Sequence, residues 1–427
     1  MDKLIIEGGR PLEGTIRAAG SKNAVLPILA ASLLSREKVE ITGAPRLADV
    51  TTMLGILREL GAEAEQDADG TVHLSAAGDI LGRAPWDAVR KMRGSVCVLG
   101  PLLTRLGRVE VSLPGGCAFG VRPIDVHLKG MRALGAKVRV EHGYVIAEAP
   151  PGGLRGARIF LGSANGPSVL GTANVAMAAT LARGVTVIEN AACEPEIVDL
   201  CDCLNAMGAK IKGHGSPMLT IEGVDELGGA VHPVIPDRIE AGTYVLAGAL
   251  AGGQVRVEGC VPNHLGALLD RMREARVPFT VGSDWIQTEA NDLRERPPRS
   301  TDVTTHAYPG FPTDLQAQWM ALMTLADGLS IITERIFSDR WMHVPELERL
   351  GAQVRRQESA VVVRGTTELS GAPVMASDLR ASAALVMAGL VARGTTEVHR
   401  VYHIDRGYEA IEERLQGIGA EIRRAKE

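Results

Sequence analysis

One pattern of apolar and polar positions recurs along the whole chain. An amphipathic segment ends in an apolar residue, then glycine and alanine, and alternating polar and apolar residues follow. The glycine positions, with one degenerate counterpart, are spaced by 74, 73, 68, 75 and 68 residues. Such spacing indicates repeated structural units, none of which can bury its apolar face alone. The copies are residues 57–62, 131–136, 204–209, 272–277 (degenerate), 347–352 and 415–420.

Each copy predicts a helix followed by two strands. The apolar positions have helical spacing up to the glycine, which can adopt the positive φ that ends a helix. The residues after it alternate as in a half-buried strand, and a glycine turn such as Gly143 leads into a second strand. The first strands are predicted at residues 137–140, 210–212, 353–355 and 421–423.

Longer alanine-rich segments are apolar on nearly every face. This composition indicates helices that are enclosed on all sides, here by the predicted sheets. They cover residues 168–182, 239–251, 314–326 and 379–392. Together the patterns predict a mixed α/β chain of six βα units, divided three and three at the prolines of residues 231–236. A small ligand is expected in the cleft between two such domains.

The composition agrees with two or three domains of ordinary size. It argues against nucleic acid as a partner and against a membrane span. The 427 residues are 45% hydrophobic but only 3% aromatic, so the cores must be aliphatic. A net charge of −5 and the scarcity of aromatic residues argue against nucleic acid. A run of 18 apolar residues is absent, so we expect no membrane span, and the N-terminal residues are too polar for a signal peptide.

The cysteines are scattered along a long chain, which is not the pattern of a disulfide framework. They also lack the paired spacing of a metal site, so we expect no metal and interpret most of them as small buried apolar residues. A reducing, cytoplasmic compartment follows from this usage. The six are Cys97, Cys117, Cys193, Cys201, Cys203 and Cys260.

Residues 113–123 hold the most distinctive candidate chemistry. They place Cys117 in a glycine-rich turn, five residues before Arg122. A thiol beside a fixed cation is favoured as thiolate, hence as a nucleophile or a tuned acid. A surface turn with a chance cysteine is an equally good interpretation of this segment alone.

Eight motifs, ordered along nearly the whole chain, resemble those of the enolpyruvyl transferase family. The resemblance implies a two-domain inside-out α/β barrel in which the N-terminal strand crosses over. One domain would comprise residues 22–235 and carry Cys117, and the other residues 1–21 plus 236–427. The motifs are residues 20–24, 114–117, 122–127, 237–240, 311–316, 337–343, 378–381 and 402–407.

The resemblance also implies a reaction. Enolpyruvate would pass from phosphoenolpyruvate to the 3′-hydroxyl of UDP-N-acetylglucosamine by addition and elimination, releasing phosphate. This is the first committed step of peptidoglycan synthesis. The implied partners are these two small molecules, with no cofactor, nucleic acid or membrane, and the chain would be a monomer or weak homo-oligomer.

Cations must gather around phosphoenolpyruvate, because it carries a phosphate and a carboxylate. Lys22 follows Ser21 at a probable helix start, where free N–H groups also favour anions. Planar guanidinium groups suit both anionic groups. By the resemblance, the phosphoenolpyruvate-binding residues are Lys22, Asn23, Arg122, Arg340, Arg380 and Arg406, of which Lys22 and Arg406 are also catalytic.

Two residues match the proton carriers that the reaction needs. Asp314 matches the base near the sugar hydroxyl, although an N-cap aspartate is the alternative for a residue that opens a helix. Cys117 matches the acid that protonates C3, and by the resemblance it can form a covalent thioether and be labelled by an epoxide phosphonate such as fosfomycin.

The nucleotide side is implied in the same way, by residues that match the family's UDP-sugar contacts. The three motif histidines, His127, His343 and His403, are interpreted as structural. We expect Asp49, Asp125, Glu194, Glu196 and Asp237 to position neighbours or cap helices. The implied UDP-sugar contacts are Asn23, Arg93, Arg122, Pro123, Ile124, Asp125, Val126, Gly166, Pro167, Ser168, Val169, Asp314 and Ile336.

The sequence departs from the family pattern near the expected diphosphate. Leu170 replaces a glycine, Ala173 replaces a common glutamate, and Cys97 stands where a larger residue is frequent. A branched side chain at position 170 narrows the space there. Another UDP-sugar or nucleotide acceptor therefore stays open, as does a catalytically silent, nucleotide-sugar-binding regulator. A shikimate 3-phosphate acceptor is a weaker option, because that branch lacks the cysteine loop.

Overall fold

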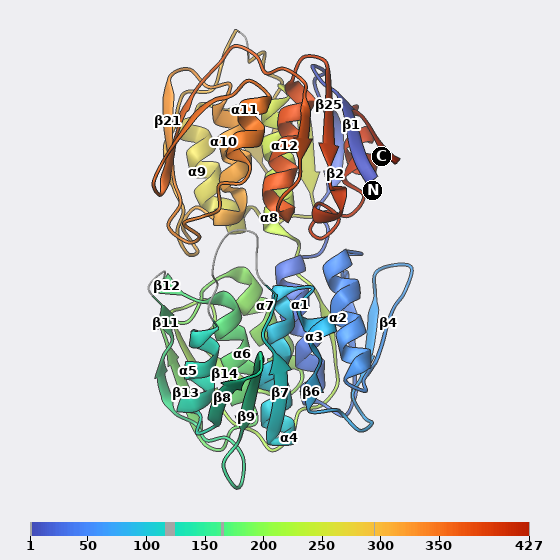
Figure 1. Ribbon diagram of the computed structural model, residues 1–427, viewed down its shortest axis with the longest axis vertical. Helices are drawn as coiled ribbons and strands as arrows, with labels where there is room; N and C mark the ends of the chain where they lie inside the picture. The colour runs from blue at the N-terminus through green and yellow to red at the C-terminus, as the bar shows by residue number, and fades with distance from the viewer. Residues whose placement is uncertain (1, 116–123, 164–165, 294, 427) are drawn as a thin grey trace. The chain divides into compact units, whose positions relative to one another are not determined.

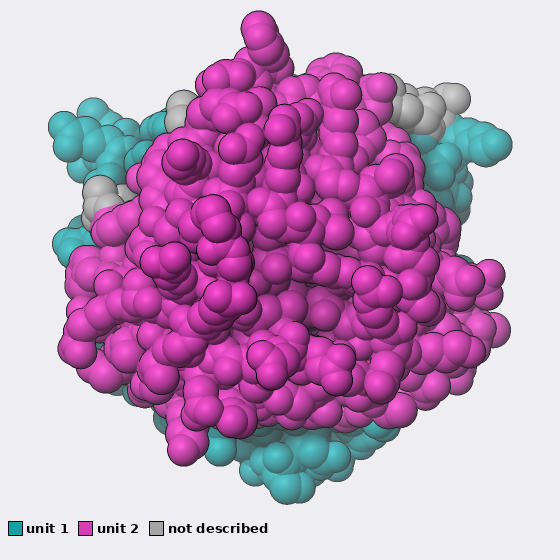
Figure 2. Space-filling view, turned by 90° about the horizontal axis from the view of Figure 1, so that it is seen from below, with its two compact units in different colours: residues 1–19, 118–120, 236–427 teal, residues 20–117, 121–235 magenta. Residues whose placement is uncertain are grey.

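The chain divides into two compact units. The computed structural model describes residues 2–115, 124–163, 166–293 and 295–426. The terminal unit comprises the described residues up to Ala19 and from Pro236 onward, and the central unit those from Gly20 to Ile235 (Figure 2). The chain passes from one unit to the other between Ala19 and Gly20 and again between Ile235 and Pro236.

The central unit contains three four-stranded sheets of one design. In each, an edge strand runs parallel to its neighbour, and the next two strands are antiparallel. A two-stranded sheet pairs β11 (Gly162–Ser163) with β12 (Gly166–Pro167). The three sheets have the orders β16 (Ala230–Pro233), β3 (Lys38–Thr42), β5 (Val72–Ser75), β4 (Glu63–Gln66); β6 (Arg83–Ala84), β7 (Arg108–Ser112), β9 (Tyr144–Glu148), β8 (Lys137–Glu141); and β10 (Arg158–Phe160), β13 (Val185–Glu189), β15 (Met218–Glu222), β14 (Lys210–Lys212).

The terminal unit repeats this design three times. The N-terminal residues complete two of its sheets, since β1 pairs with both β25 and β26 while β2 lies parallel to β17. The sheets have the orders β2 (Glu13–Arg17), β17 (Gln254–Glu258), β19 (Trp285–Thr288), β18 (Phe279–Val281); β20 (Val303–Thr304), β21 (Leu329–Thr333), β23 (Ala360–Arg364), β22 (Gln353–Gln357); and β24 (Pro373–Met375), β25 (Thr395–His399), β1 (Asp2–Glu7), β26 (Glu421–Lys426).

The alanine-rich segments form buried helices, as predicted. In the terminal unit α8 (Arg238–Leu250), α10 (Gln316–Met323) and α12 (Leu379–Val391) pack against one another between the sheets (Figure 1). The central unit has the corresponding helices α1 (Lys22–Ala31), α4 (Leu99–Leu106) and α6 (Val169–Ala179). The alanine and glycine residues of α6, α8 and α12 allow close approach of the elements around them.

A second set of helices ends where the repeat predicts. The residue at the repeated glycine position has a positive φ in all six copies, including Arg276 at 58°. The helices are α2 (Ala48–Glu59), α5 (Asp125–Ala133), α7 (Pro195–Ala206), α9 (Gly266–Glu274), α11 (Val344–Arg349) and α13 (Ile411–Gln416). Shorter helical elements are α3 (Trp86–Val89) and the 3₁₀ turns η1 (Ser32–Leu34), η2 (Arg93–Val98), η3 (Pro262–Leu265), η4 (Thr313–Leu315) and η5 (Val401–His403).

Arg276 should be a site of stored conformational strain. Its side chain is exposed, yet its φ of 58° lies in the left-handed region that disfavours residues with a Cβ. Arg276→Gly is expected to raise the free energy of unfolding by about 0.5–1 kcal/mol, measured by urea denaturation. The matched control is Gly208→Ala (φ 103°), where a Cβ would meet open space, and which should lower stability by about 1 kcal/mol. A lower stability of Arg276→Gly would contradict this account.

The predicted break at residues 231–236 is partly a strand. Pro233 ends β16, which lies at the edge of its sheet, where a residue without an N–H is tolerated. The connecting segments are paired within each unit: the Ser21 N–H donates to the Ile235 carbonyl at 2.7 Å, and the Asp237 N–H to the Ala19 carbonyl at 2.8 Å. In each unit, a backbone hydrogen bond therefore joins the two segments at which the chain passes from one unit to the other.

The cores are aliphatic, and several cysteines belong to them. Cys97, Cys201 and Cys203 are buried, and burial raises the pKa of each thiol to about 12. They therefore act as small apolar residues, as expected. None of the helices in the described parts of the chain combines the length and hydropathy needed to span a bilayer.

Candidate active site

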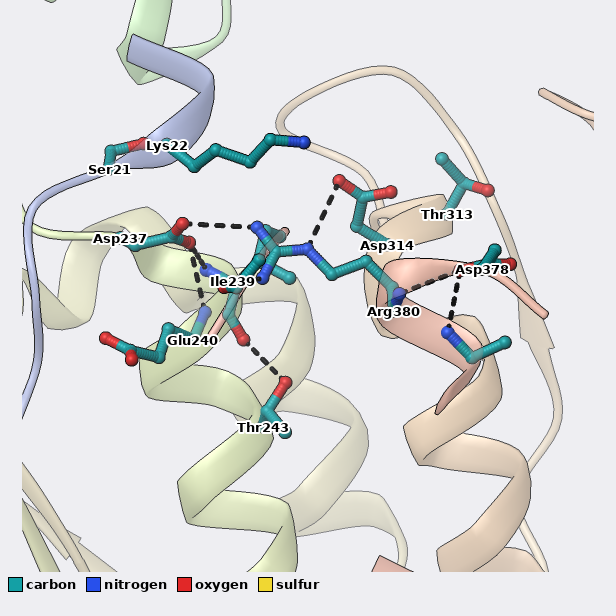
Figure 3. A network of polar contacts seen from close by, with 12 residues as sticks. Ser21, Lys22, Asp237, Ile239, Glu240, Thr243, Thr313, Asp314, Asp378 and Arg380 are labelled. Carbon is teal, nitrogen blue, oxygen red and sulfur yellow. Dashed lines mark hydrogen bonds and ion pairs between the residues drawn. The ribbon is translucent and has the colours of Figure 1, made fainter. Parts of the chain in front are cut away.

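The N-terminal ends of the three buried helices in the terminal unit carry acidic residues (Figure 3). Asp237 caps α8 by accepting hydrogen bonds from the N–H groups of residues 239 and 240 at 2.8 and 3.0 Å. Asp378 caps α12 in the same way, from residues 380 and 381 at 2.7 and 2.9 Å. Asp314 lies in η4, directly before α10, whereas the N-cap positions of η4 and α10 are Pro312 and Leu315. The N-cap alternative for Asp314 is therefore wrong.

Two buried arginines connect these carboxylates into one network. Arg340 Nη1 lies 2.6 Å from Asp314 Oδ1, and its Nε lies 3.7 Å from Asp378 Oδ2. Arg380 Nη2 lies 3.1 Å from Asp237 Oδ2, and its Nε lies 4.0 Å from Asp314 Oδ2. Asp314 is 25% exposed, whereas the side chains of the other four residues are 5% exposed or less. Asp314 is therefore the member of the network that can meet a solute.

The charges in this network stabilise one another against burial. Burial alone would lower the pKa of Arg340, but the carboxylates of Asp314 and Asp378 outweigh it and raise the pKa. Burial would likewise raise the pKa of Asp378, but Arg340 and two backbone N–H groups lower it below its usual value. Both arginines stay cationic, since the Asp237 carboxylate also raises the pKa of Arg380 in spite of burial.

The turn that contains Arg406 is held from both sides. Arg380 Nη1 donates to the Gly407 carbonyl at 3.3 Å, and its guanidinium lies 5.1 Å from the centre of the Tyr408 ring. On the other side, Asp405 accepts hydrogen bonds from Arg424 at 2.7 and 3.0 Å. Arg406 lies between Asp405 and Gly407 in the sequence, so both of its neighbours are held by these contacts.

Two motif histidines of this unit, His343 and His403, are poor proton carriers at neutral pH. Burial lowers the pKa of His343 to about 4, and burial with the charge of Arg406 lowers the pKa of His403. His343 is fully buried beside Asp378 and Arg340. Both observations support the structural interpretation of these residues.

Lys22 occupies a defined position in the central unit. Ser21 caps α1 by accepting from the Ala24 N–H at 3.3 Å, so Lys22 is the first residue of the helix, as predicted. Its Nζ lies 2.8 Å from Asp49 Oδ2, and both side chains are buried. A buried lysine requires such a partner. Asp49 was expected only to position a neighbour, and Lys22 is that neighbour.

Most of the expected nucleotide-side residues that the structure describes lie in the central unit, whereas Asp314 and Ile336 lie in the terminal unit. Asn23 lies on α1, Arg93 begins η2, and Ile124–Val126 form the start of α5. Gly166 and Pro167 form β12, and Ser168 caps α6 by accepting from the Gly171 N–H at 3.1 Å, directly before Val169. Helix α6 contacts α1, α5 and η2.

Asn174, fully buried on α6, connects these elements by hydrogen bonds. Its Oδ1 accepts from the Gly100 N–H at 2.6 Å, and its Nδ2 donates to the Val96 carbonyl at 2.7 Å. Nδ2 also lies 3.0 Å from His127 Nδ1. Burial and the nearby charge of Arg93 lower the pKa of His127 to about 3, so this histidine is neutral and structural.

The residues that depart from the family pattern lie in or against the central core. Leu170 is half-buried and packs against it, while Ala173 and Cys97 are fully buried. The acid, phosphate and nucleotide assignments rest partly on residues that lie outside the described part of the chain: Cys117, Arg122 and Pro123.

Ile336 lies shortly after β21 in the terminal unit. Its backbone N–H donates a hydrogen bond to Glu334 Oε1 at 2.7 Å. Sequence reasoning missed Glu334, whose one signal is an acidic residue directly after an alternating strand.

The chain matches one family model over nearly its whole length. The model of EPSP synthase (3-phosphoshikimate 1-carboxyvinyltransferase) matches residues 6–415. A protein of Coxiella burnetii named UDP-N-acetylglucosamine 1-carboxyvinyltransferase is 51% identical over 99% of this chain and 96% of its own length. Proteins of the same name from Desulfatibacillum aliphaticivorans and an Anaeromyxobacter species are 52% and 53% identical over the full length of both chains.

Solved structures show the same mixed α/β fold. The enolpyruvyl transferase NikO from Streptomyces tendae superposes with a TM-score of 0.89 at 25% identity, covering 99% of this chain and 98% of its own. An EPSP synthase from Acinetobacter baumannii superposes with a TM-score of 0.74 at 18% identity over the full length of both. The chain therefore belongs to the EPSP synthase family of enolpyruvyl transferases and, within it, to the family of the UDP-N-acetylglucosamine 1-carboxyvinyltransferases.

Proposed function

We propose that this chain transfers the enolpyruvyl group of phosphoenolpyruvate to the 3′-hydroxyl of UDP-N-acetylglucosamine and releases phosphate. The observation that carries the proposal is the network of Asp314, Arg340 and Arg380 at the helix ends of the terminal unit. It supplies a carboxylate that is 25% exposed, between two buried cations, in a chain about half identical to relatives named for this reaction. The reaction begins peptidoglycan synthesis.

The chemistry requires two proton movements. As the sugar oxygen attacks C2 of phosphoenolpyruvate, its hydroxyl proton passes to Asp314, and C3 gains a proton from Cys117 to become a methyl group. The tetrahedral intermediate then loses a C3 proton, and the bond between C2 and the phosphate oxygen breaks. Arg340 and Arg380 stabilise the negative charge that moves during these steps, because their geometry is fixed before the reaction.

The remaining site residues are assigned by the same match. Lys22 and Arg406 act on the phosphate together with Arg122, and Asn23 contacts both substrates. The UDP-sugar is bound by Arg93, Arg122, Pro123, Ile124, Asp125, Val126, Gly166, Pro167, Ser168, Val169, Asp314 and Ile336. The buried Lys22–Asp49 pair supports the assignment of Lys22, because it presets a cation at a helix start.

The architecture we infer is the two-domain inside-out α/β barrel, with three βα units in each domain. The three equivalent four-stranded sheets of each unit support this inference. We infer in addition a cytoplasmic enzyme, monomeric or weakly homo-oligomeric.

The test is phosphate release from phosphoenolpyruvate in the presence of single acceptors. We expect release with UDP-N-acetylglucosamine to exceed that with other UDP-sugars, free nucleotides and shikimate 3-phosphate. Leu170→Gly is measured beside the wild type, because the half-buried Leu170 is the departure that raised the acceptor question. A lower Michaelis constant in that variant would show that Leu170 crowds the sugar nucleotide. No release with any acceptor at high enzyme concentration would favour the silent, nucleotide-sugar-binding alternative.

A further inference from the structure

A buried carboxylate holds three loops of the terminal unit together. Glu334 follows β21 and is 1% exposed. Its Oε1 accepts hydrogen bonds from the N–H groups of Ile336 and Phe337 at 2.7 and 2.9 Å, and from Thr305 Oγ1 at 2.7 Å. Its Oε2 accepts from Thr313 Oγ1 at 2.8 Å. These four donors satisfy a charge that would otherwise be costly to bury.

Thr313 connects Glu334 to the ion pair of Asp314. Arg340 Nη1 donates to Thr313 Oγ1 at 3.1 Å and to Asp314 Oδ1 at 2.6 Å. The threonine hydroxyl has a single proton, which it gives to Glu334, so it accepts from Arg340. The Glu334 carboxylate accepts and the Arg340 guanidinium donates, so these two charged groups determine the direction of both hydrogen bonds of Thr313. Because Thr313 and Asp314 are consecutive in η4, this relay orients the turn that carries Asp314.

We propose that Glu334 is a positioning residue for the reaction inferred above. Through Thr313 it holds Asp314 in the orientation needed to take the hydroxyl proton, and through its backbone contacts it holds Ile336 for the sugar nucleotide. This proposal rests on the proposed function, which assigns those roles to Asp314 and Ile336. At 1% exposure Glu334 acts through its neighbours, and a displacement of about 1 Å at a reacting group costs about 100-fold in rate.

The experiment measures kcat for Glu334→Gln, for Thr313→Val and for the double variant, with phosphoenolpyruvate and UDP-N-acetylglucosamine saturating. Glutamine keeps the size of the side chain but removes an acceptor from the relay, and valine removes the hydroxyl. Each single variant should lower kcat about 10- to 100-fold while circular dichroism and the melting temperature report a folded protein. The double variant should be little worse than the poorer single variant, because both break one relay.

The matched control is Thr301→Val. Thr301 is buried in the same unit and donates to the Arg299 carbonyl at 3.1 Å, away from the contacts of Glu334, so kcat should stay near that of the wild type. Wild-type kcat in both single variants, or losses that multiply in the double variant, would overturn the proposal while leaving the function intact. If Glu334→Gln does not fold, Thr313→Val decides alone. A wild type that releases no phosphate would instead overturn the proposed function, and this proposal with it.

Discussion

Asp314→Asn should leave a folded protein whose kcat is about 10²- to 10⁴-fold lower, the usual contribution of a general base. Asparagine has nearly the same shape and can still accept the hydrogen bond from Arg340, so the 2.6 Å contact survives in altered form. The buried guanidinium of Arg340 loses the charge of Asp314 but keeps that of Asp378, whose Oδ2 lies 3.7 Å from its Nε. The loss should therefore be much larger in turnover than in stability.

The measurement is phosphate release at saturating substrates, beside a thermal melt. Asp302→Asn is the matched control, because Asp302 is an exposed carboxylate of the same unit that accepts from the Ile331 N–H at 2.6 Å. It should retain wild-type kcat. Turnover by Asp314→Asn close to that of the wild type would remove Asp314 from the base role and return the assignment to another residue.

Arg380→Met should be the most destabilising single change in the network, at about 3–5 kcal/mol. It removes a buried cation and leaves Asp237 Oδ2 and the Gly407 carbonyl without their donor at 3.1 and 3.3 Å. Urea denaturation followed by tryptophan fluorescence, to which the buried Trp319 of the same unit contributes, measures the loss. Phosphate release should also fall, since Arg380 is assigned to the carboxylate of phosphoenolpyruvate.

A double variant separates the lost ion pair from lost packing. Asp237→Asn removes the carboxylate charge that Arg380 pairs with but keeps an oxygen that can cap α8, so adding it to Arg380→Met should restore part of the stability. Lys210→Met, which breaks an exposed pair with Glu222 at 2.7 Å, should leave the denaturation midpoint nearly unchanged. Equal midpoints for the wild type and Arg380→Met would show that this buried pair contributes nothing to folding.

Features that depend on neighbouring residues could be predicted from the sequence. The helix ends marked by glycine, the strands after them and the alanine-rich buried helices all follow from periodicity and from backbone preferences. Even the degenerate copy was placed by its spacing, and Arg276 adopts the backbone conformation of the glycine it replaces. Ser21 at the N-cap before Lys22 is a local signal of the same kind.

Features that depend on distant residues could not be predicted in this way. The pairing of Asp314 with Arg340 joins positions 26 residues apart, which no local pattern specifies. Glu334 accepts hydrogen bonds from residues that precede it in the chain, such as Thr305, and from residues that follow it, such as Phe337. Its role is therefore visible only in the folded structure. The resemblance to a family located most of the network because it compares whole motifs, but it could not say which carboxylate stays accessible.

The closure of two terminal-unit sheets by the first strands of the chain has a consequence for synthesis on the ribosome. All strands of the central unit lie within residues 38–233, so that unit can fold while the rest is still being translated. Strand β1 is synthesised long before its partners β25 and β26. It must therefore wait, unpaired, until both have been made, with the slow search that long-range pairing imposes.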